Sequence, residues 1–341
     1  MLDDLKYLHN RDSADALGIA AKKWQQLGNG FELPHVPKAF ENVVYAGMGG
    51  SALAALVAQV WPGINLPFEI CREYNIPKFV SSKTLFIAAS YSGNTEETLS
   101  TLTQAEETGA TIFIITGGGK LKDRAQEKDY PFLVLPKATE PRYADFYNLV
   151  AIVSIFDALG LTSNKLDELA AAAPFLKQAA EDWLPTVPQA KNPAKKLAYE
   201  LAGKSLAVYG GPLMAPAAYK WKISFQENAK NVAWWNVLPE FDHNELIGWT
   251  GHPVDKPYGI IELRSNLEHP RVQKRFEVAE RLLSGRRPAP HVVQVQGKTL
   301  VEQLAWAINF GDFVSIYLAL LNNQDPAPVP LVEKFKKALD E

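Results

Sequence analysis

Short apolar runs alternate with helical segments along the first half of the chain. Four of these runs contain few or no polar residues, and they occupy residues 43–46, 84–89, 112–115 and 132–135. Strands that are apolar throughout, rather than at every second position, are typical of a parallel sheet covered by helices on both faces. Residues 52–61 and 96–109 carry apolar side chains at helical spacing after the first two runs. The pattern therefore predicts a doubly wound α/β sandwich domain.

The same strand, turn and helix return in the second half of the chain. Residues 205–209 read as a strand, 210–212 as a turn and 214–230 as a helix, which echoes residues 43–61. Further segments of regular structure are predicted as strands at 258–263 and 292–295 and as a long buried helix at 300–321. The chain thus reads as a duplicated fold, in which only the first copy has hydroxyl-rich loops.

These patterns divide the chain into five predicted segments. Apolar residues recur at one-turn spacing up to about Pro37, which indicates a helical arm before the first sandwich. A long helix near residues 149–161 and an Ala-, Pro- and Lys-containing stretch separate the two copies. The predicted organisation is an N-terminal helical arm at 1–38, a first sandwich domain at 39–160, a helical connection at 161–196, a second sandwich domain at 197–324 and a C-terminal tail helix at 325–341.

Composition narrows the range of partners and compartments. The 35 Lys and Arg residues are balanced by 38 Asp and Glu, the net charge is −3, and no basic run could follow a nucleic-acid backbone. A single cysteine, Cys71, can form neither an internal disulfide nor a CxxC zinc pair. The charged segment Met1–Asp12 lacks the apolar core of a signal peptide, and no segment approaches the length of an uninterrupted membrane span. We expect a cytoplasmic protein that binds neither nucleic acid nor membrane.

The first loop with candidate chemistry follows the strand at 43–46. Helix N-termini at strand ends attract anions, and Gly49 and Gly50 allow the backbone to approach a ligand while Ser51 adds a hydroxyl. The loop also fits the dinucleotide pattern G-x-G-x-x-A, with Glu69 about 20 residues further on. By itself it favours a sugar phosphate and a dinucleotide equally, and an ordinary tight turn is a third interpretation.

The second loop favours a compact phosphate. Ser90, Ser92 and Thr95 lie within six residues at a strand end, where their hydroxyls can donate to one phosphate group. Asn94 is predicted to cap the following helix, with Glu97 completing a capping box. The simpler alternative is a capped helix with ordinary turn residues.

Both loops resemble the phosphate loops of sugar isomerase (SIS) domains. The resembling segments are Gly49-Gly50-Ser51 and residues 90–98. This family binds phosphosugars as isomerases, as amidotransferase domains and as regulators. The resemblance implies two SIS-type domains and a substrate phosphate bound by Gly49, Gly50, Ser51, Ser90, Ser92 and Thr95.

Three further parts of the chain resemble the bifunctional phosphoglucose/phosphomannose isomerase family, namely residues 140–144, residues 221–230 with 239–245, and the tail at 325–336. The resemblance implies that Glu227 is the base that moves a proton between C1 and C2. It also implies that Arg142 faces the enediolate and that His243, with Lys336, assists ring opening. Without the family, Arg142 reads as a loop arginine and Lys336 as one of several lysines on a solvated amphipathic helix.

The two most specific candidates also have simpler interpretations. Glu227 could be a helix-surface carboxylate that pairs with Lys230 one turn further on. His243 could lie near a helix start that Asp242 or Asn244 caps. For Glu227 or His243 taken alone, the simpler interpretation is the better one. The family motif is what favours a catalytic role for each.

The resemblance implies an aldose–ketose isomerase that interconverts glucose 6-phosphate and fructose 6-phosphate, and also mannose 6-phosphate, through a cis-enediolate without metal or other cofactor. It further implies a homodimer in which His243 acts across the interface. Ala327 stands where related tails often have a threonine, which leaves the activity on mannose 6-phosphate less secure. The alternatives are a non-catalytic phosphosugar-binding SIS regulator and an NAD-dependent oxidoreductase.

Overall fold

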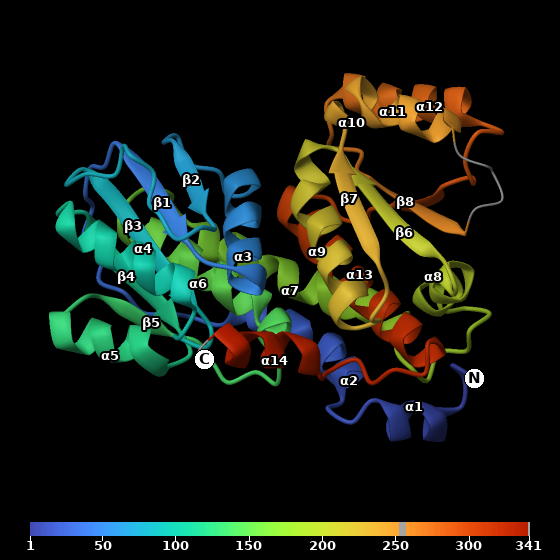
Figure 1. Cartoon of the computed structure of the whole chain (residues 1–341), viewed down its shortest axis with the longest axis horizontal. Coiled ribbons are helices and arrows are strands. Elements are labelled where there is room, and N and C mark those ends of the chain that lie inside the picture. Colours follow the sequence, from blue (N-terminus) through green and yellow to red (C-terminus); the bar gives the residue numbers. More distant parts are fainter. Residues whose placement is uncertain (252–256, 340–341) are drawn as a thin grey trace. The chain divides into compact units, whose positions relative to one another are not determined.

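The computed structural model describes residues 1–251 and 257–339 (Figure 1). Residues 252–256 of the predicted second domain and 340–341 of the predicted tail lie outside this description. The chain forms two compact units, one made of Met1–Lys22 with Phe175–Glu341 and the other of Lys23–Pro174. We call them the N/C unit and the middle unit.

The middle unit is built on a five-stranded parallel sheet with the order β2-β1-β3-β4-β5. Its strands are β1 (Asn42–Ala46), β2 (Phe68–Cys71), β3 (Thr84–Ser90), β4 (Thr111–Thr116) and β5 (Phe132–Val134). The four strands expected from apolar runs are all present. Sequence reasoning did not predict β2, because this edge strand is only partly buried and lacks a continuous apolar run.

Helices cover both faces of this sheet, as the doubly wound prediction requires. They are α3 (Gly49–Val60), α4 (Glu96–Glu107), α5 (Gly119–Lys128) and α6 (Asp145–Ala158), with short 3₁₀ turns η1 (Lys23–Gly28) and η2 (Pro141–Tyr143). Helices α4 and α5 pack on one face through Leu102, Ala105, Leu121 and Ala125. Because parallel crossovers are right-handed and the chain leaves β1 and β3 in opposite directions, α3 covers the other face.

The N/C unit repeats this topology with one strand fewer. Its sheet has the order β7-β6-β8-β9 and is parallel throughout. The strands are β6 (Ser205–Gly210), β7 (Ala233–Val237), β8 (Tyr258–Arg264) and β9 (His291–Gln294). This order matches that of the first four strands of the middle unit, with β6 in the place of β1 and β8 in the place of β3. The predicted duplication of the fold is therefore confirmed.

The helices of this unit include the longest one in the described chain. They are α8 (Pro193–Leu201), α9 (Ala215–Glu227), α10 (Glu240–His243), α11 (Glu245–Gly248), α12 (Pro270–Leu283) and α13 (Leu300–Leu321), with η3 (Pro212–Met214) and η4 (Trp249–Gly251). Helix α13 begins with a capping box between Thr299 and Glu302. It is long and apolar enough to cross a membrane, but it is buried inside the unit, as the sequence predicted for a core helix.

Buried polar contacts join α9 to α13. The Lys220 ammonium lies 2.9 Å from the Asp312 carboxylate, and the Ser224 hydroxyl donates to that same carboxylate at 3.1 Å. One turn further on, Asn228 donates to the Ser315 hydroxyl at 2.9 Å. Since an unpaired buried polar group is costly, these contacts fix the register of α9 along α13.

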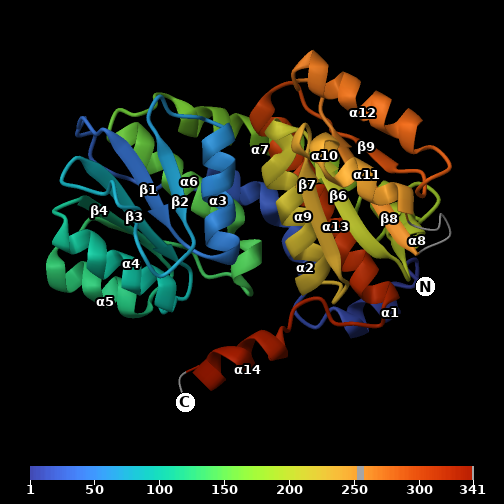
Figure 2. The ribbon, with the colours of Figure 1, turned by 45° about the horizontal axis from the view of Figure 1, so that its top comes forward.

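The N-terminal arm is shorter than expected. It contains α1 (Leu5–Arg11), α2 (Ala16–Lys22) and η1, after which residues 29–41 form no helix, so the expectation of helix up to about Pro37 is wrong for that part. Helices α7 (Lys165–Glu181) and α8 fall within the predicted helical connection and just beyond it, and α14 (Pro330–Leu339) forms the tail. Figure 2 shows the strands of each unit running side by side with helices around them.

Candidate active site

The order of the first sheet fixes where a ligand can bind. The chain goes from β1 to β2 on one side and returns to β3 on the other, so the direction of winding reverses between β1 and β3. Ligands of open α/β sheets bind at such a switch point, outside the carboxyl ends of the strands. Both predicted phosphate loops, after β1 and after β3, start at this point (Figure 1).

The same order counts against a dinucleotide site. Dinucleotide-binding sheets follow the order 3-2-1-4-5-6, whereas this one follows 2-1-3-4-5. Glu69, the residue expected to hold the ribose, lies inside edge strand β2, where it pairs with Val44 and is exposed. The oxidoreductase interpretation therefore loses its structural support.

The first loop is packed tightly against its neighbours. Gly49 begins α3 with φ of +50°, and Ser51 is buried in the first turn. A Cβ on Gly47 would lie 2.9 Å from the carbonyl oxygen of Ala89, and one on Gly50 would lie 3.3 Å from that of Pro141. Glycine at these positions thus lets the loop contact both the end of β3 and the segment that carries Arg142.

The three hydroxyls of the second loop are gathered as predicted. The Ser90 hydroxyl lies 2.7 Å from that of Thr95 and 3.3 Å from that of Ser92, and the Gly93 amide donates to Ser90 at 3.1 Å. Ser90 is buried whereas Ser92 is exposed. A compact group of hydroxyls at a helix start, with one of them open to solvent, matches the needs of a phosphate that enters and leaves.

The predicted capping box at α4 is wrong. The N-cap residue is Thr95, and its side chain bonds to Ser90 and makes no capping bond to the described residues of the helix. Asn94 instead accepts a hydrogen bond from the Lys120 amide at 3.1 Å, which ties this loop to the start of α5. Neither Asn94 nor Thr95 therefore caps the first-turn N–H groups of α4 through its side chain.

A third loop, which sequence reasoning missed, supports the second one. Gly117, Gly118 and Gly119 connect β4 to α5, and the Gly117 amide donates to the Tyr91 carbonyl at 3.0 Å. A Cβ on Gly93 would lie 1.7 Å from the Gly118 carbonyl oxygen, so the two loops touch through their backbones. Three successive glycines after an apolar strand were the signal that could have revealed this contact.

Arg142 lies beside the first phosphate loop. Its side chain is 3% exposed, its Nη1 is 3.3 Å from the Glu140 carboxylate, and its guanidinium stacks 4.9 Å from the centre of the Tyr143 ring. A Cβ on Gly50 would lie 3.4 Å from the Arg142 Cα. The structure therefore packs the backbone of Arg142 against the first loop and buries its side chain, so Arg142 is not an exposed loop arginine.

The other catalytic candidates lie in the N/C unit. Glu227 is the half-buried last residue of α9 and precedes the buried Asn228. The Lys230 ammonium donates to the carbonyl oxygens of Asp325 at 2.5 Å and Pro326 at 3.3 Å. The Glu227–Lys230 turn and the Asp-Pro segment of the tail, two motifs far apart in the sequence, thus meet in space.

His243 does not lie at a capped helix start. It is the exposed last residue of α10, Asp242 pairs with Arg275 at 2.8 Å, and Asn244 donates to Glu240 at 2.6 Å. Helix α9 runs back from the carboxyl edge of the sheet before β7, whereas α10 follows the carboxyl end of β7. Glu227 and His243 therefore lie at opposite edges of the second sheet.

Lys336 is on α14, whose described residues are all exposed. Ala327 is buried, and its amide donates to the Asp325 carboxylate at 3.0 Å.

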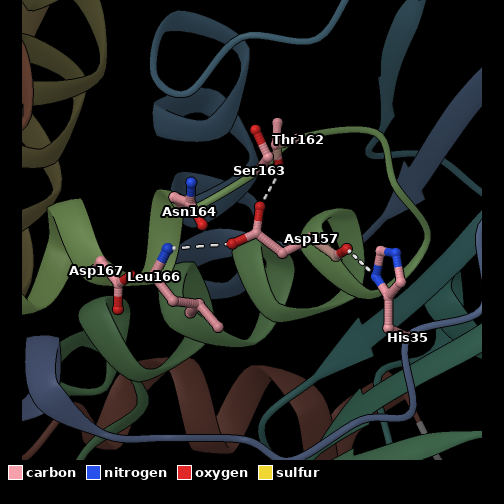
Figure 3. Close-up of a pocket in the computed structure, with 7 residues that line it drawn as sticks. All are labelled: His35, Asp157, Thr162, Ser163, Asn164, Leu166 and Asp167. Atoms are coloured by element: carbon pink, nitrogen blue, oxygen red, sulfur yellow. Dashed lines mark hydrogen bonds between the residues drawn. The ribbon is translucent and has the colours of Figure 1, made fainter.

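Figure 3 shows a separate hollow of about 310 Å³ in the middle unit. The Asp157 carboxylate accepts hydrogen bonds from the Thr162 hydroxyl at 2.6 Å and the Lys165 amide at 3.0 Å, so it fixes the turn before α7. The His35 ring lies 3.2 Å from the Asp157 carbonyl oxygen. These contacts explain the hollow as a helix junction, and it contains no residue of the predicted site.

Solved structures share this tandem fold. A glucose-6-phosphate isomerase-like protein from Thermus thermophilus matches with a TM-score of 0.64 at 20% identity, over 98% of this chain and 98% of that one. The two parallel sandwiches, with hydroxyl loops at the switch point of the first, place the chain in the class of tandem SIS-domain proteins, and the predicted fold class is confirmed.

Sequence relatives identify the family. Residues 190–339 match the profile of the bacterial phospho-glucose isomerase C-terminal SIS domain. A bifunctional phosphoglucose/phosphomannose isomerase of Caldicellulosiruptor bescii is 33% identical over 325 residues, 94% of this chain and 96% of that protein. A D-glucosamine-6-phosphate 4-epimerase of Sulfolobus acidocaldarius is 33% identical over 218 residues, 63% of this chain and 66% of that protein. The chain belongs to the bifunctional phosphoglucose/phosphomannose isomerase family and is an isomerase.

Proposed function

We propose that this enzyme interconverts glucose 6-phosphate and fructose 6-phosphate, and also mannose 6-phosphate, in the cytoplasm. The observation that carries the proposal is the cluster of Ser90, Ser92 and Thr95 at the β1/β3 switch point, where the first loop also packs against the backbone of the buried Arg142. The hydroxyls and the free N–H groups of α4 hold the substrate phosphate. The family relatives supply the reaction, since those that cover most of the chain are named as isomerases of these two sugars.

The proposed chemistry uses one base and one fixed cation. Glu227 takes the proton from C2 of the open-chain sugar and returns it to C1, so that an aldose becomes a ketose without change of oxidation state in the whole molecule. Arg142 stabilises the negative oxygens of the cis-enediolate, because a buried guanidinium in a water-poor site needs little reorganisation as charge develops. Mannose 6-phosphate forms when the proton returns to C2 from the opposite face.

Ring opening is assigned to His243 from a second subunit, with Lys336. The positions of Glu227 and His243 at opposite edges of one sheet support this assignment, because the two residues cannot meet within their own unit. The exposure of His243 is also what a residue that completes a neighbouring site requires. We therefore propose a homodimer, and a monomer that keeps full activity at high dilution would contradict it.

The test is the variant Glu227→Gln, which keeps the shape of the side chain and removes its basicity. We expect turnover to fall by at least about 100-fold, the contribution of a general base, while glucose 6-phosphate still binds. Glu107→Gln is the matched control, since Glu107 is also the last residue of its helix but lies in the middle unit, and it should keep full activity. Normal turnover in Glu227→Gln would refute the base assignment.

The substrate is tested with the wild-type protein. Coupled assays started from glucose 6-phosphate, from mannose 6-phosphate and from glucosamine 6-phosphate separate the proposed isomerase from a 4-epimerase. Fructose 6-phosphate from the first two substrates is expected. Conversion of glucosamine 6-phosphate alone would move the chain to the activity named for the Sulfolobus relative.

A further inference from the structure

The segment that carries His243 cannot hold its shape by itself. His243 ends α10 and Glu245 begins α11, each of which has four residues, and Asn244 between them has φ of −141° and ψ of −53°, outside the helical range. A helix this short is unstable alone in water, because ordering its first turn outweighs the few hydrogen bonds that it forms. The position of His243 therefore depends on contacts between this segment and the rest of the N/C unit.

The carboxylate of Glu245 anchors the segment to the second sheet. Its Oε1 accepts a hydrogen bond from the Tyr209 hydroxyl, and its Oε2 accepts one from the Asn236 side-chain amide at 2.7 Å. Tyr209 and Asn236 are paired in register near the carboxyl ends of β6 and β7, so their side chains leave the same face of the sheet. Both oxygens of one carboxylate are thus bound to neighbouring strands, two residues after His243.

Tyr209 also holds the chain on the other side of His243. The centre of its ring lies 4.8 Å from that of Phe241, and the two side chains are 1% and 2% exposed. Burial, and after it the charge of Glu245, raises the pKa of Tyr209, so the hydroxyl keeps its proton and stays a donor to the carboxylate. A hydrogen bond to a charged acceptor is stronger than one between neutral groups. One buried tyrosine therefore contacts the residues two before and two after His243.

Two arginines fix the same segment further. Arg275 on α12 donates to the Asp242 carboxylate at 2.8 Å, and the guanidinium of Arg287 lies 5.9 Å from the centre of the Phe241 ring. His243 itself is exposed, and among the described residues its side chain makes no hydrogen bond or ion pair. The contacts thus hold the backbone on both sides of His243 and leave its imidazole available.

We infer that Tyr209 and Glu245 are positioning residues for His243. They do not touch the sugar; their hydrogen bond, and the packing of Tyr209 on Phe241, hold the backbone that carries the imidazole. A group that transfers a proton must lie within hydrogen-bond reach of its target, and a misplacement of about 1 Å lowers turnover by up to about 100-fold. The inference rests on the proposed role of His243 in ring opening, and it gives the motif at residues 239–245 a second functional side chain, Glu245.

The central variant is Tyr209→Phe, which removes only the hydroxyl and keeps the ring against Phe241. Turnover of glucose 6-phosphate by the full-length enzyme is expected to fall about 10-fold, with KM nearly unchanged because the proposed phosphate loops lie in the middle unit. Glu245→Ala removes both hydrogen bonds and is expected to lower turnover about 100-fold. Tyr317→Phe is the matched control, since it removes a buried hydroxyl that donates to the Trp183 carbonyl at 2.6 Å in the same unit, and it should keep full turnover.

A double-mutant cycle separates positioning from a general loss of structure. Tyr209→Phe is combined with His243→Ala, and circular dichroism confirms that each variant is folded. The double variant should lose no more turnover than His243→Ala, because no imidazole is left to position. A second loss of about 10-fold in the absence of the imidazole would show that Tyr209 supports only the fold, and it would overturn the inference.

The single variants distinguish the inference from the proposed function on which it rests. A loss in His243→Ala together with full turnover in Tyr209→Phe would overturn the positioning role alone. Full turnover in His243→Ala would overturn the role of His243 in ring opening, and the inference with it. If Glu245→Ala does not fold, the cycle with Tyr209→Phe decides the inference by itself.

Discussion

From the contact between the second and third loops we predict how much unfolding free energy the protein loses in Gly93→Ala. Gly93 has φ of +70°, where an L-residue costs about 1–2 kcal/mol relative to glycine. Its new Cβ would also lie 1.7 Å from the Gly118 carbonyl oxygen, so the loops must separate by more than about 1 Å. Overpacking of this kind costs about 1–3 kcal/mol in addition, and the total loss of unfolding free energy is expected to be about 2–5 kcal/mol.

Gly109→Ala is the matched control for this variant. Gly109 has φ of +75° in the same unit, but the nearest atom to its new Cβ would be the Ser82 Cβ at an ordinary 3.7 Å. It should lose only the backbone term of about 1–2 kcal/mol. Urea unfolding of the middle unit is measured for both variants. The difference between their losses of unfolding free energy gives the cost of the loop contact.

A measurement of ligand affinity shows whether the clash at Gly93 lowers stability alone or also alters the proposed phosphate site. Separation of the loops moves Ser92 and the start of α4, so Gly93→Ala should bind glucose 6-phosphate at least about 10-fold more weakly in calorimetry, whereas Gly109→Ala should bind it normally. Equal stability losses and equal affinities in the two variants would refute the reasoning that the glycine loop supports the phosphate loop.

Two further predictions concern buried charges. Lys23→Met removes the ammonium that lies 2.7 Å from the Asp145 carboxylate, in a pair whose side chains are 1% and 2% exposed. Breaking such a buried pair should lower the unfolding free energy in urea by about 3–5 kcal/mol, and replacing both residues by apolar ones should restore most of it. An equally unstable double variant would contradict this reasoning. For Glu268, burial raises the pKa above the ordinary 4.5, so its stabilising contribution is complete below that value and is lost as the pH rises through the folded pKa. The unfolding free energy of the wild type, measured against Glu268→Gln, should therefore fall as the pH rises from below 4.5 through the raised pKa of the folded state. A difference that does not change with pH would show that Glu268 has the same pKa in the folded and unfolded chain.

Burial decides which elements could be predicted from the sequence. Strand β3 is buried at every position and produced an unmistakable apolar run. Strands β2 and β7 are edge strands with partly exposed residues, so their sequences carry little periodicity and neither was predicted. Helix α12 was missed although Val272, Phe276, Ala279 and Leu283 recur at helical spacing on its buried face.

For the site too, groups within one short segment could be predicted from the sequence, whereas contacts between residues far apart in the sequence could not. The group formed by Ser90, Ser92 and Thr95 lies within one short segment, so its chemistry was visible in the sequence. The contacts of Asn94 with the Lys120 amide and of Glu268 with the Leu213 amide cross 26 and 55 residues. Nothing in the local sequence indicates such partners, which is why the capping box was predicted at Asn94 and Glu268 received no role.

The two copies of the fold satisfy the same requirement in different ways. Amides at a helix start beside the switch point need an acceptor, and an unpaired buried donor costs about 1–3 kcal/mol. In the first copy the proposed acceptor is the phosphate of the substrate, and the loop accordingly has an exposed Ser92 and an α4 that is uncapped by side chains among the described residues. In the second copy the amides of Leu213 and Met214 are held by the fixed carboxylate of Glu268. A fixed acceptor keeps the start of α9 constant whether or not a sugar phosphate is present, and this suits a helix whose last residue is the proposed base.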